Sequence, residues 1–254
     1  MPEGDTLHRA AKTLHLALAG KRVVGFESEI ATVRTAAENK PLVGETVVGV
    51  SAVGKHLLME LSNGVTLRTH MRMNGSWHIY RRGERWKRPR SAMRIVLQTE
   101  DFEAVAFDVP VAELVTAKQL ARGDVGRLGP DVLGETFDVD AAIARLRALG
   151  PQPIGELLLN QRVAAGIGNI WKSESLYRCG VRPDRRGPDV SDDELREIFA
   201  AARKLMSASV RGARPRFEVY EREGEPCRKC ETPIAYFKQG LGARGTYFCP
   251  ACQT

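Results

Sequence analysis

Four cysteines near the C-terminal end constrain the fold of this chain more than any other feature. They form two C-x2-C pairs, Cys227 with Cys230 and Cys249 with Cys252, and 18 residues separate the pairs. Each pair can hold a metal ion from a tight turn, and the residues between the pairs suit a β-hairpin. Four thiolates make a closed tetrahedral site, which is typical of structural zinc. The spacing therefore predicts one structural Zn2+ ion, with a redox or accidental cysteine pairing as the alternative.

Charge and hydropathy narrow the class of protein. The 254 residues include 38 Lys and Arg against 31 Asp and Glu, and this excess of positive charge favours a polyanionic partner. Hydrophobic residues make up 43% of the chain, which excludes a disordered tail. The sequence contains no run of 18 apolar residues, so no transmembrane helix is expected. The acidic N-terminal residues do not resemble a secretory signal. We therefore expect a cytoplasmic protein.

The first hundred residues show one helical pattern followed by strand patterns. Apolar residues from Leu7 to Leu18 recur with the period of a helix, which we expect Asp5 to cap and Gly20 to end. Short segments rich in β-formers follow, and their close turns predict an antiparallel sandwich or barrel. These segments are residues 22–26, 46–53, 56–61, 65–70, 75–80 and 92–99.

The pattern becomes helical beyond Asp108. Residues 119–136 are rich in glycine and predict an interdomain linker. Helices are expected at residues 140–149, 154–165, 169–179 and 192–210. Ser191 and Glu194 form a capping box at the start of the last of these helices. The expected organisation is an N-terminal domain, a linker, a helical domain and a finger, at residues 1–118, 119–136, 137–216 and 217–254.

Two short segments carry candidate chemistry. Removal of Met1 would expose the secondary amine of Pro2, which condenses directly with an aldehyde to an iminium ion. The adjacent helix start would disfavour the ammonium form, and Glu3 could act as acid or base. The turn Gly166-Ile167-Gly168-Asn169 precedes a helix N-terminus and predicts a phosphate site. The alternatives are that Pro2 affects only processing and that the glycines mark an ordinary helix corner.

Six basic residues gather in one loop, residues 81–90, and only Glu84 opposes them there. They are Arg81, Arg82, Arg85, Lys87, Arg88 and Arg90. A charge run of this kind supports nonspecific attraction to a polyanion. A solvated, disordered loop is at least as good an interpretation as direct contact with a polyanion.

Five motifs in a fixed order resemble one known family. They are Pro2-Glu3-Gly4-Asp5, Gly54-Lys55-His56-Leu57-Leu58, His70-Met71-Arg72-Met73-Asn74-Gly75, the segment from Gly166 to Glu174, and the terminal segment from Gly245 to Gln253. Together they resemble the formamidopyrimidine-DNA glycosylase and endonuclease VIII family of bacterial base-excision repair. Gly4 makes the opening more similar to the endonuclease VIII branch.

The resemblance implies an α+β fold. An N-terminal antiparallel β-sandwich with flanking helices would be followed by a helix–two-turn–helix domain that carries a C-terminal zinc-finger β-hairpin. This agrees with the order of strands, helices and cysteines inferred from the residue pattern alone.

The resemblance also implies roles for single residues in a DNA glycosylase with abasic-site lyase activity. Pro2 would attack C1′ of the damaged nucleotide, Glu3 would protonate the ring oxygen, and Lys55 would clamp a phosphate beside the lesion. The resemblance also implies three DNA contacts. Asn169 and Arg244 would bind phosphates, and Met73 would be a wedge that fills the gap left by the flipped base. On its residue type alone, Met73 could instead fill the sandwich core.

The expected partner is double-stranded DNA with oxidised bases or abasic sites, bound by a monomer associated with the nucleoid. The segment Phe107-Asp108-Val109-Pro110-Val111 lacks the Arg and Phe wedge of the formamidopyrimidine branch, so oxidised pyrimidines are the favoured lesions. β-Elimination would follow excision, with a second, δ-elimination left open. The first alternative is a noncatalytic zinc-finger protein that binds damaged DNA, and the second is an RNA- or ribosome-associated zinc-ribbon protein.

Overall fold

The computed structural model describes residues 2–254, so the predicted removal of Met1 concerns a residue outside the described range. The chain divides into two compact units, Met1–Arg127 and Leu128–Thr254. The boundary between the units falls within the predicted linker, residues 119–136. The end of the short helix α3 (Ala117–Arg122) and the 3-10 turn η2 (Val125–Arg127) also lie in this segment.

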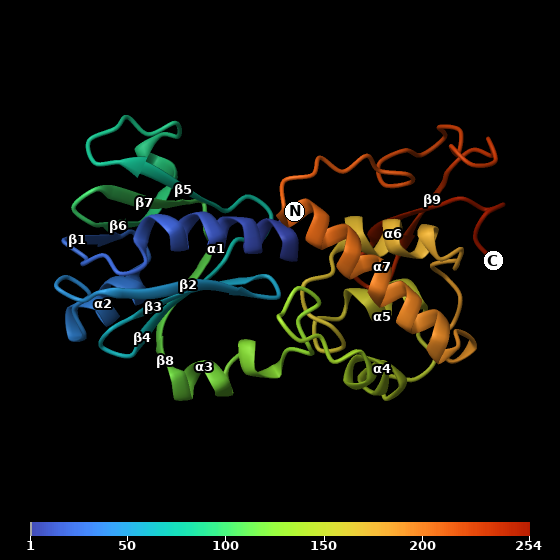
Figure 1. The fold of residues 1–254 in the computed structure, drawn as a ribbon, viewed down its shortest axis with the longest axis horizontal. Helices are drawn as coiled ribbons and strands as arrows, with labels where there is room; N and C mark the ends of the chain where they lie inside the picture. The colour runs from blue at the N-terminus through green and yellow to red at the C-terminus, as the bar shows by residue number, and fades with distance from the viewer. Residues whose placement is uncertain (1) are drawn as a thin grey trace. The chain divides into compact units, whose positions relative to one another are not determined.

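Two four-stranded antiparallel sheets build the N-terminal unit (Figure 1). One has the strand order β1-β6-β7-β5 and the other β2-β3-β4-β8. Their bounds are β1 Gly25–Ser28, β2 Val47–Val53, β3 His56–Leu61, β4 Val65–His70, β5 Ser76–Arg81, β6 Met93–Gln98, β7 Phe102–Phe107 and β8 Val111–Thr116. The predicted antiparallel sandwich is confirmed.

Helix α1 (Gly4–Leu18) belongs to the core of this unit. Leu7, Leu14 and Leu18 are at most 1% exposed and pack in one apolar cluster with strand residues such as Leu67 and Ile95. Because the helix begins at Gly4, its N-cap residue is Glu3, and the prediction that Asp5 caps it is wrong. The end of the helix near Gly20 agrees with the sequence.

Three elements of the N-terminal unit differ from the sequence-based expectation. Helix α2 (Ala31–Asn39) and strand β7 were not expected, and β8 lies where the pattern beyond Asp108 had suggested helix. Helix α2 buries only Val33 fully, so it shows little of the periodic apolar stripe on which a helix prediction depends. β8 pairs with β4 along its whole length, and this long-range pairing decides its conformation.

The C-terminal unit contains a helical core followed by a hairpin. Its α-helices are α4 Val139–Arg147, α5 Ile154–Leu159, α6 Asn169–Arg178 and α7 Asp192–Val210. The 3-10 turn η3 (Gly187–Asp189) lies between α6 and α7. The capping box of Ser191 and Glu194 is present at the start of α7. Helix α5 ends six residues earlier than the predicted 154–165, because a turn around Gln161 replaces its last part.

The hairpin of strands β9 (Ala235–Gln239) and β10 (Arg244–Phe248) lies between the two cysteine pairs, as predicted. Gln253 ties the end of the hairpin region to the helical core, because its amide donates to Val181 O and accepts from Cys249 N–H. Within residues 2–254, no helix is both long enough and apolar enough to span a membrane.

Candidate functional site

Four segments of the N-terminal unit meet at one end of the sandwich. Helix α1 runs antiparallel to β2, because Gly20 N–H bonds Val47 O and Val50 N–H bonds His15 Nδ1. From His15 to the start of α1 at Gly4, the helix rises about 16 Å. From Val50, which contacts His15, the extended chain of β2 covers about the same 16 Å to Lys55 in the same direction. Pro2 and Glu3 therefore lie at the same end as the turn between β2 and β3.

Strand pairing brings two more segments to this end. His70 at the end of β4 pairs with His56 at the start of β3 and with Val111 at the start of β8. The turn that follows β4, which contains Met73, therefore emerges beside the turn that contains Lys55. The structure thus gathers four of the predicted site residues, Pro2, Glu3, Lys55 and Met73, at one end of the N-terminal unit.

Pro2 directly precedes the helix start. Glu3, the N-cap residue, is only 2% exposed, and its carbonyl oxygen accepts the N–H groups of Thr6 and Leu7. Pro2 is half-buried. Pro2 therefore lies beside the positive end of the helix dipole of α1.

Lys55 lies in a two-residue turn that requires glycine. Gly54 has a φ of +58° and occupies the left-handed region, which glycine adopts without steric cost. Beside the turn, the rings of His56 and His70 lie edge to face at 4.8 Å between centroids. Burial, the neighbouring His70 and the Arg68 guanidinium lower the pKa of His56 to about 4. Burial, Arg72 and the Lys55 ammonium lower the pKa of His70 to about 4 as well. Both imidazoles are therefore neutral near pH 7.

Met73 stands at the tip of a rigid turn. Gly75 N–H bonds Met71 O at 2.9 Å, and a Cβ at position 75 would lie 2.5 Å from that oxygen. Met71 is buried, whereas 58% of the surface of Met73 is exposed. The alternative that Met73 fills the sandwich core is therefore wrong, because the turn presents its side chain to solvent.

The C-terminal unit brings Asn169 and the hairpin together through a buried lysine. Asn169 is the first residue of α6, and its side-chain amide donates to Gly245 O at 2.5 Å. Lys172, one turn further along α6, is fully buried. Its ammonium donates to Asn169 Oδ1 at 2.8 Å and to Thr246 Oγ1 at 2.7 Å. Because Lys172 can only donate, it fixes which side of the Asn169 carboxamide is oxygen. The second Nδ2 hydrogen of Asn169 is thereby oriented as a donor.

Arg244 begins β10, next to the residue that Asn169 contacts, and its side chain is exposed. Opposite it in the hairpin stands Gln239, whose side chain is buried and donates to Pro183 O at 2.8 Å. Thr246 connects this glutamine to Lys172, because its hydroxyl lies 3.3 Å from Gln239 Oε1. Asn169 and Arg244 are therefore held by one polar network between α6 and the hairpin.

The four finger cysteines form one cluster that fits a metal ion. The Sγ atoms of Cys227, Cys230, Cys249 and Cys252 lie within 4.8 Å of one another. Lys229 N–H points at Cys227 Sγ at 3.4 Å, and a donor in that position favours the thiolate form. The donor set of four thiolates suits a single structural zinc ion, and the prediction of the metal site is confirmed.

Two residues that the sequence analysis did not single out organise these segments. Besides Lys172, Gln161 holds the Gly166–Asn169 turn, because its amide donates to Ile167 O at 2.9 Å and accepts Gly166 N–H at 3.0 Å. Lys172 lies within the motif segment from Gly166 to Glu174 but was given no role of its own, and Gln161 stands in no spacing with a recognised meaning. Only the proximity of Lys172 and Gln161 to the glycine turn could have suggested a role.

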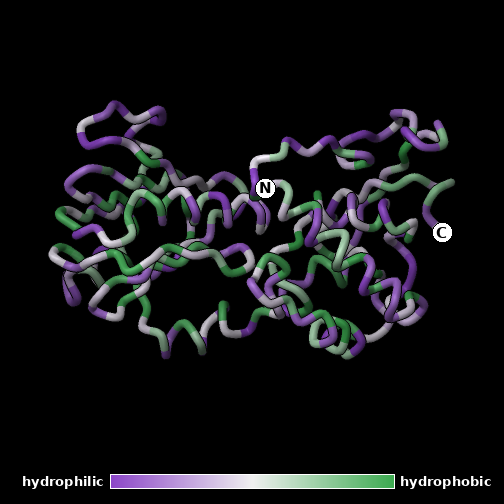
Figure 2. The backbone as a smooth tube through the Cα atoms, in the orientation of Figure 1, coloured by the Kyte–Doolittle hydropathy of each residue, from purple (hydrophilic) through white to green (hydrophobic). Residues whose placement is uncertain are grey.

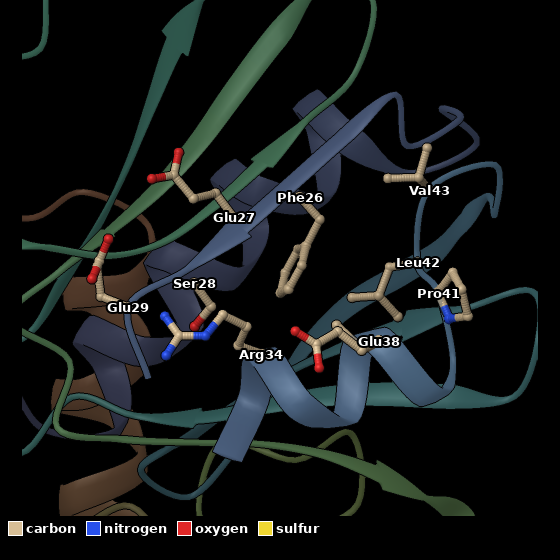
Figure 3. Close-up of a pocket in the computed structure, with 10 residues that line it drawn as sticks. Phe26, Glu27, Ser28, Glu29, Arg34, Glu38, Pro41, Leu42 and Val43 are labelled. Carbon is tan, nitrogen blue, oxygen red and sulfur yellow. The ribbon is translucent and has the colours of Figure 1, made fainter. Parts of the chain in front are cut away.

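A separate pocket of about 450 Å³ between β1 and α2 contains none of the predicted site residues. Figure 3 shows Phe26 and Leu42 in this pocket, together with the carboxylates of Glu27 and Glu38. These acidic groups make the pocket unsuitable for a phosphate backbone, which is also negatively charged.

Comparison with known protein families gives matches along most of the chain. Residues 1–110 match the formamidopyrimidine-DNA glycosylase N-terminal domain, and residues 128–217 match the formamidopyrimidine-DNA glycosylase H2TH domain. Residues 224–254 match a zinc finger found in FPG and IleRS. The three matches follow one another in the order of the sandwich, the helices and the hairpin.

Curated relatives are similar over the full chain. A probable endonuclease 8 2 of Streptomyces coelicolor is 38% identical, covering 100% of this chain and 94% of the relative. The DNA-(apurinic or apyrimidinic site) lyase Nei2 of Mycolicibacterium smegmatis is 34% identical over 100% of this chain and 99% of the relative. Endonuclease 8 of Escherichia coli is 32% identical, with 100% of both chains covered.

Solved structures share the fold. A Lactococcus lactis formamidopyrimidine-DNA glycosylase bound noncovalently to DNA containing an abasic site matches with a TM-score of 0.86 at 23% identity, and 100% of both chains is covered. MutM in complex with DNA that contains carbocyclic 8-oxo-G matches equally, with a TM-score of 0.86, 23% identity and 100% coverage of both chains.

Proposed function

Since the chain belongs to the formamidopyrimidine-DNA glycosylase and endonuclease VIII family of base-excision-repair enzymes, which are bifunctional glycosylases and abasic-site lyases, we propose that it removes oxidised bases, pyrimidines in particular, from double-stranded DNA. The observation that carries the proposal is the meeting of Pro2, Glu3, Lys55 and Met73 at one end of the sandwich. We further propose that it acts as a monomer in the cytoplasm, at the nucleoid.

The chemistry begins at the nitrogen of Pro2. Once Met1 is removed, this secondary amine attacks C1′ of the flipped nucleotide, and the N-glycosidic bond breaks as the base leaves with the bonding electrons and takes up the proton that the attacking nitrogen releases. The C1′–O4′ bond then opens, and O4′ takes a proton from Glu3. The product is an iminium ion that joins C1′ to the proline nitrogen. Because Glu3 is almost fully buried, its proton exchange is shielded from bulk water.

Strand cleavage follows from the acidity of the iminium ion. The C2′ proton leaves, its electrons form a C2′=C3′ bond, and the 3′ phosphate departs. A second elimination would release the 5′ phosphate in the same way. Water finally hydrolyses the iminium ion and returns the free amine. None of these steps needs a metal ion, so we assign the zinc to holding the hairpin that presents Arg244.

DNA contacts hold the nucleotide outside the stack. We propose that Lys55, Asn169 and Arg244 bind phosphates, which fixes the position of the backbone without reading sequence. Met73 fills the gap left by the flipped base, because an apolar wedge offsets part of the unstacking cost of a few kcal/mol. Its 58% exposure at the tip of a rigid turn supports this role.

Borohydride trapping tests the proposed function. The protein is incubated with a duplex that contains thymine glycol or an abasic site, borohydride is added, and we expect a covalent protein–DNA adduct that maps to Pro2. A matched variant carries one additional residue before Pro2, which turns the amine into an amide. We expect this variant to bind the lesion duplex without forming an adduct.

Two outcomes would contradict the proposal. Adduct formation by the extended variant would show that another amine is the nucleophile. Binding without an adduct or strand cleavage by correctly trimmed protein would favour the noncatalytic zinc-finger protein that binds damaged DNA.

A further inference from the structure

The loop that joins β5 to β6 is more ordered than its composition suggests. This basic loop, residues 81–90, contains six cations and one carboxylate. Figure 2 shows it as a predominantly hydrophilic segment beyond the end of β5. A run of this composition is compatible with disorder, yet the structure gives it specific contacts.

Aromatic contacts anchor the middle of the basic loop. Trp86 Nε1 donates to Glu103 Oε2 at 3.0 Å, and the indole lies edge to face with Phe107 at 5.8 Å between centroids. Lys87 N–H donates to the Tyr80 hydroxyl at 3.1 Å. Tyr80 and Phe107 belong to a small apolar cluster separate from the core of the sandwich. The loop is therefore anchored at two consecutive residues, by the side chain of Trp86 and by the backbone N–H of Lys87.

Two of the six cations are part of this anchor. Arg88 pairs with Asp108, donates to Ser76 Oγ at 3.2 Å, and lies over the Phe107 ring. Arg90 pairs with Glu27 at 2.6 Å. Their charges are compensated within the protein, so they stabilise the loop rather than attract a ligand.

The other four cations have no such compensation. Arg81, Arg82, Arg85 and Lys87 are exposed, and none of them forms an ion pair with a carboxylate in residues 2–254. Glu84, the acidic residue of the loop, uses its carboxylate to accept Arg81 N–H at 3.0 Å. The loop therefore presents four positive charges from a fixed backbone, which reduces the entropy lost when they bind a ligand.

The shape of the loop favours phosphate over a nucleobase. Residues 84–90 surround a shallow hollow of about 550 Å³. The Arg90 guanidinium lies 5.7 Å from the centre of the Trp86 ring, which covers one face of the indole and limits base stacking. Burial, Arg88 and Lys87 lower the pKa of the neighbouring His78, in agreement with a positive local potential.

We propose that the basic loop is an additional contact site for the phosphodiester backbone of duplex DNA, formed by Arg81, Arg82, Arg85 and Lys87 on the Trp86 anchor and distinct from the lesion site. This proposal rests on the proposed function in one respect, which is the identification of the polyanion as DNA. The site binds lesion-free and lesion-containing duplexes alike, because phosphate contacts carry no sequence information. It therefore supplies affinity and leaves the chemistry at Pro2 unchanged.

The test compares two variants with the same loss of charge. The loop variant is R81Q/R82Q/R85Q/K87Q, and the control is K12Q/K40Q/K118Q/K204Q, which neutralises four exposed lysines elsewhere. Dissociation constants are measured between 50 and 200 mM salt on 30-base-pair duplexes, one lesion-free and one with a tetrahydrofuran abasic analogue. Each phosphate contact adds about 0.9 to the slope of log K against log salt. We expect the slope of the loop variant to fall by about two to three and a half on both duplexes, and that of the control to fall by less than about one.

An equal loss in both variants, or an unchanged slope in the loop variant, would overturn the proposal. The rate of borohydride trapping at saturating protein should match that of the wild type. A slower rate in the loop variant would place the loop in the lesion site instead and would also overturn it. Because DNA binding is measured separately from trapping, a wild type that binds DNA without forming an adduct refutes the proposed chemistry alone.

Discussion

His56 shows how one buried side chain couples stability to pH. It is 7% exposed, and its Nδ1 accepts a hydrogen bond from Arg68 Nη1 at 3.1 Å. A neutral imidazole can accept this bond, whereas an imidazolium cannot, because both of its nitrogens carry hydrogen. The folded chain thus takes up a proton at His56 only near its pKa of about 4, far below the ordinary histidine pKa of 6.5.

We predict acid lability of the N-terminal unit from this difference. Between pH 6.5 and about 4 the unfolded chain binds more protons at His56 than the folded chain does, so the contribution of His56 to the free energy of unfolding falls as pH drops through this range. Above pH 6.5 the titration of His56 no longer changes the free energy of unfolding. Near pH 4 the free energy of unfolding that is lost through His56 approaches about 3 kcal/mol. Chemical denaturation of His56→Gln at pH 7 and pH 4.5 should show a smaller difference than wild type.

The matched control is His8→Gln, at a half-buried histidine of α1. It should keep the wild-type difference between the two pH values. If His56→Gln kept that difference too, His56 would not be the source of the acid lability.

Single residues were predictable where their type and spacing define the chemistry. The four cysteines belong to this group, whereas the roles of Pro2 and Glu3 stay a prediction. The burial of Lys172 and its contact with the hairpin were not predictable, because its partner Thr246 lies 74 residues away in the sequence. A lysine in a helix is usually a solvated residue, and only the approach of the hairpin buries this one.

At the scale of elements, Lys172 couples α6 to the zinc-finger hairpin. Replacement by methionine keeps the volume and removes the donor. Asn169 Oδ1 and Thr246 Oγ1 then lose a charged partner in a buried site, which costs about 1–3 kcal/mol of stability in the C-terminal unit. We predict that Lys172→Met binds the abasic-analogue duplex about tenfold more weakly while it retains its zinc, because the Asn169 carboxamide is free to turn.

A double-mutant cycle separates this role from general destabilisation. In an Asn169→Ala background, Lys172→Met should cause little further loss of DNA affinity. Lys204→Met, at an exposed position of α7, serves as the matched control and should bind as wild type does. Fully additive losses in the cycle would show that Lys172 does not act through Asn169.

Elements with strong local signals were predicted well, and those that depend on distant pairing were not. The capping box and apolar stripe of α7 lie within the element itself. Strand β8 depends on β4, from which 40 residues separate it. The early end of α5 depends on the side chain of Gln161, which bonds the backbone of the next turn instead of continuing the helix.

At the scale of the whole molecule, the zinc ion belongs to one of two compact units. The finger and the helical core share the C-terminal unit, whereas the sandwich has its own apolar core. We predict that Cys249→Ala releases zinc and lowers the unfolding temperature of the C-terminal unit, because metal binding contributes to the folding of such sites. DNA affinity should fall before the sandwich unfolds.

Calorimetry with metal analysis checks this prediction. The transition of the sandwich should stay at its wild-type temperature in Cys249→Ala, and chelation of the wild type should reproduce the result. Cys179→Ala is the matched control, because this fifth cysteine lies outside the metal cluster. Retention of a full equivalent of zinc by Cys249→Ala would show that the four-thiolate site is wrong.

The order of sandwich, helices and finger was predictable because each uses a different residue period or spacing. The spacing of apolar residues distinguishes strands from helices, and the cysteines mark the finger. The residue pattern alone left the arrangement of strands open as sandwich or barrel, since the choice depends on how strands far apart in the sequence pair, and the family resemblance alone implied the sandwich.

The anchored indole of Trp86 gives the molecule an optical reporter. The other two tryptophans lie in β5 and α6, at Trp77 and Trp171, so their replacement by phenylalanine leaves Trp86 as the sole emitter. Its emission should be blue-shifted while the ring rests against Phe107, and should shift to longer wavelength if that contact opens. The wavelength of Trp86 fluorescence would then report whether the loop stays anchored when the protein binds a duplex.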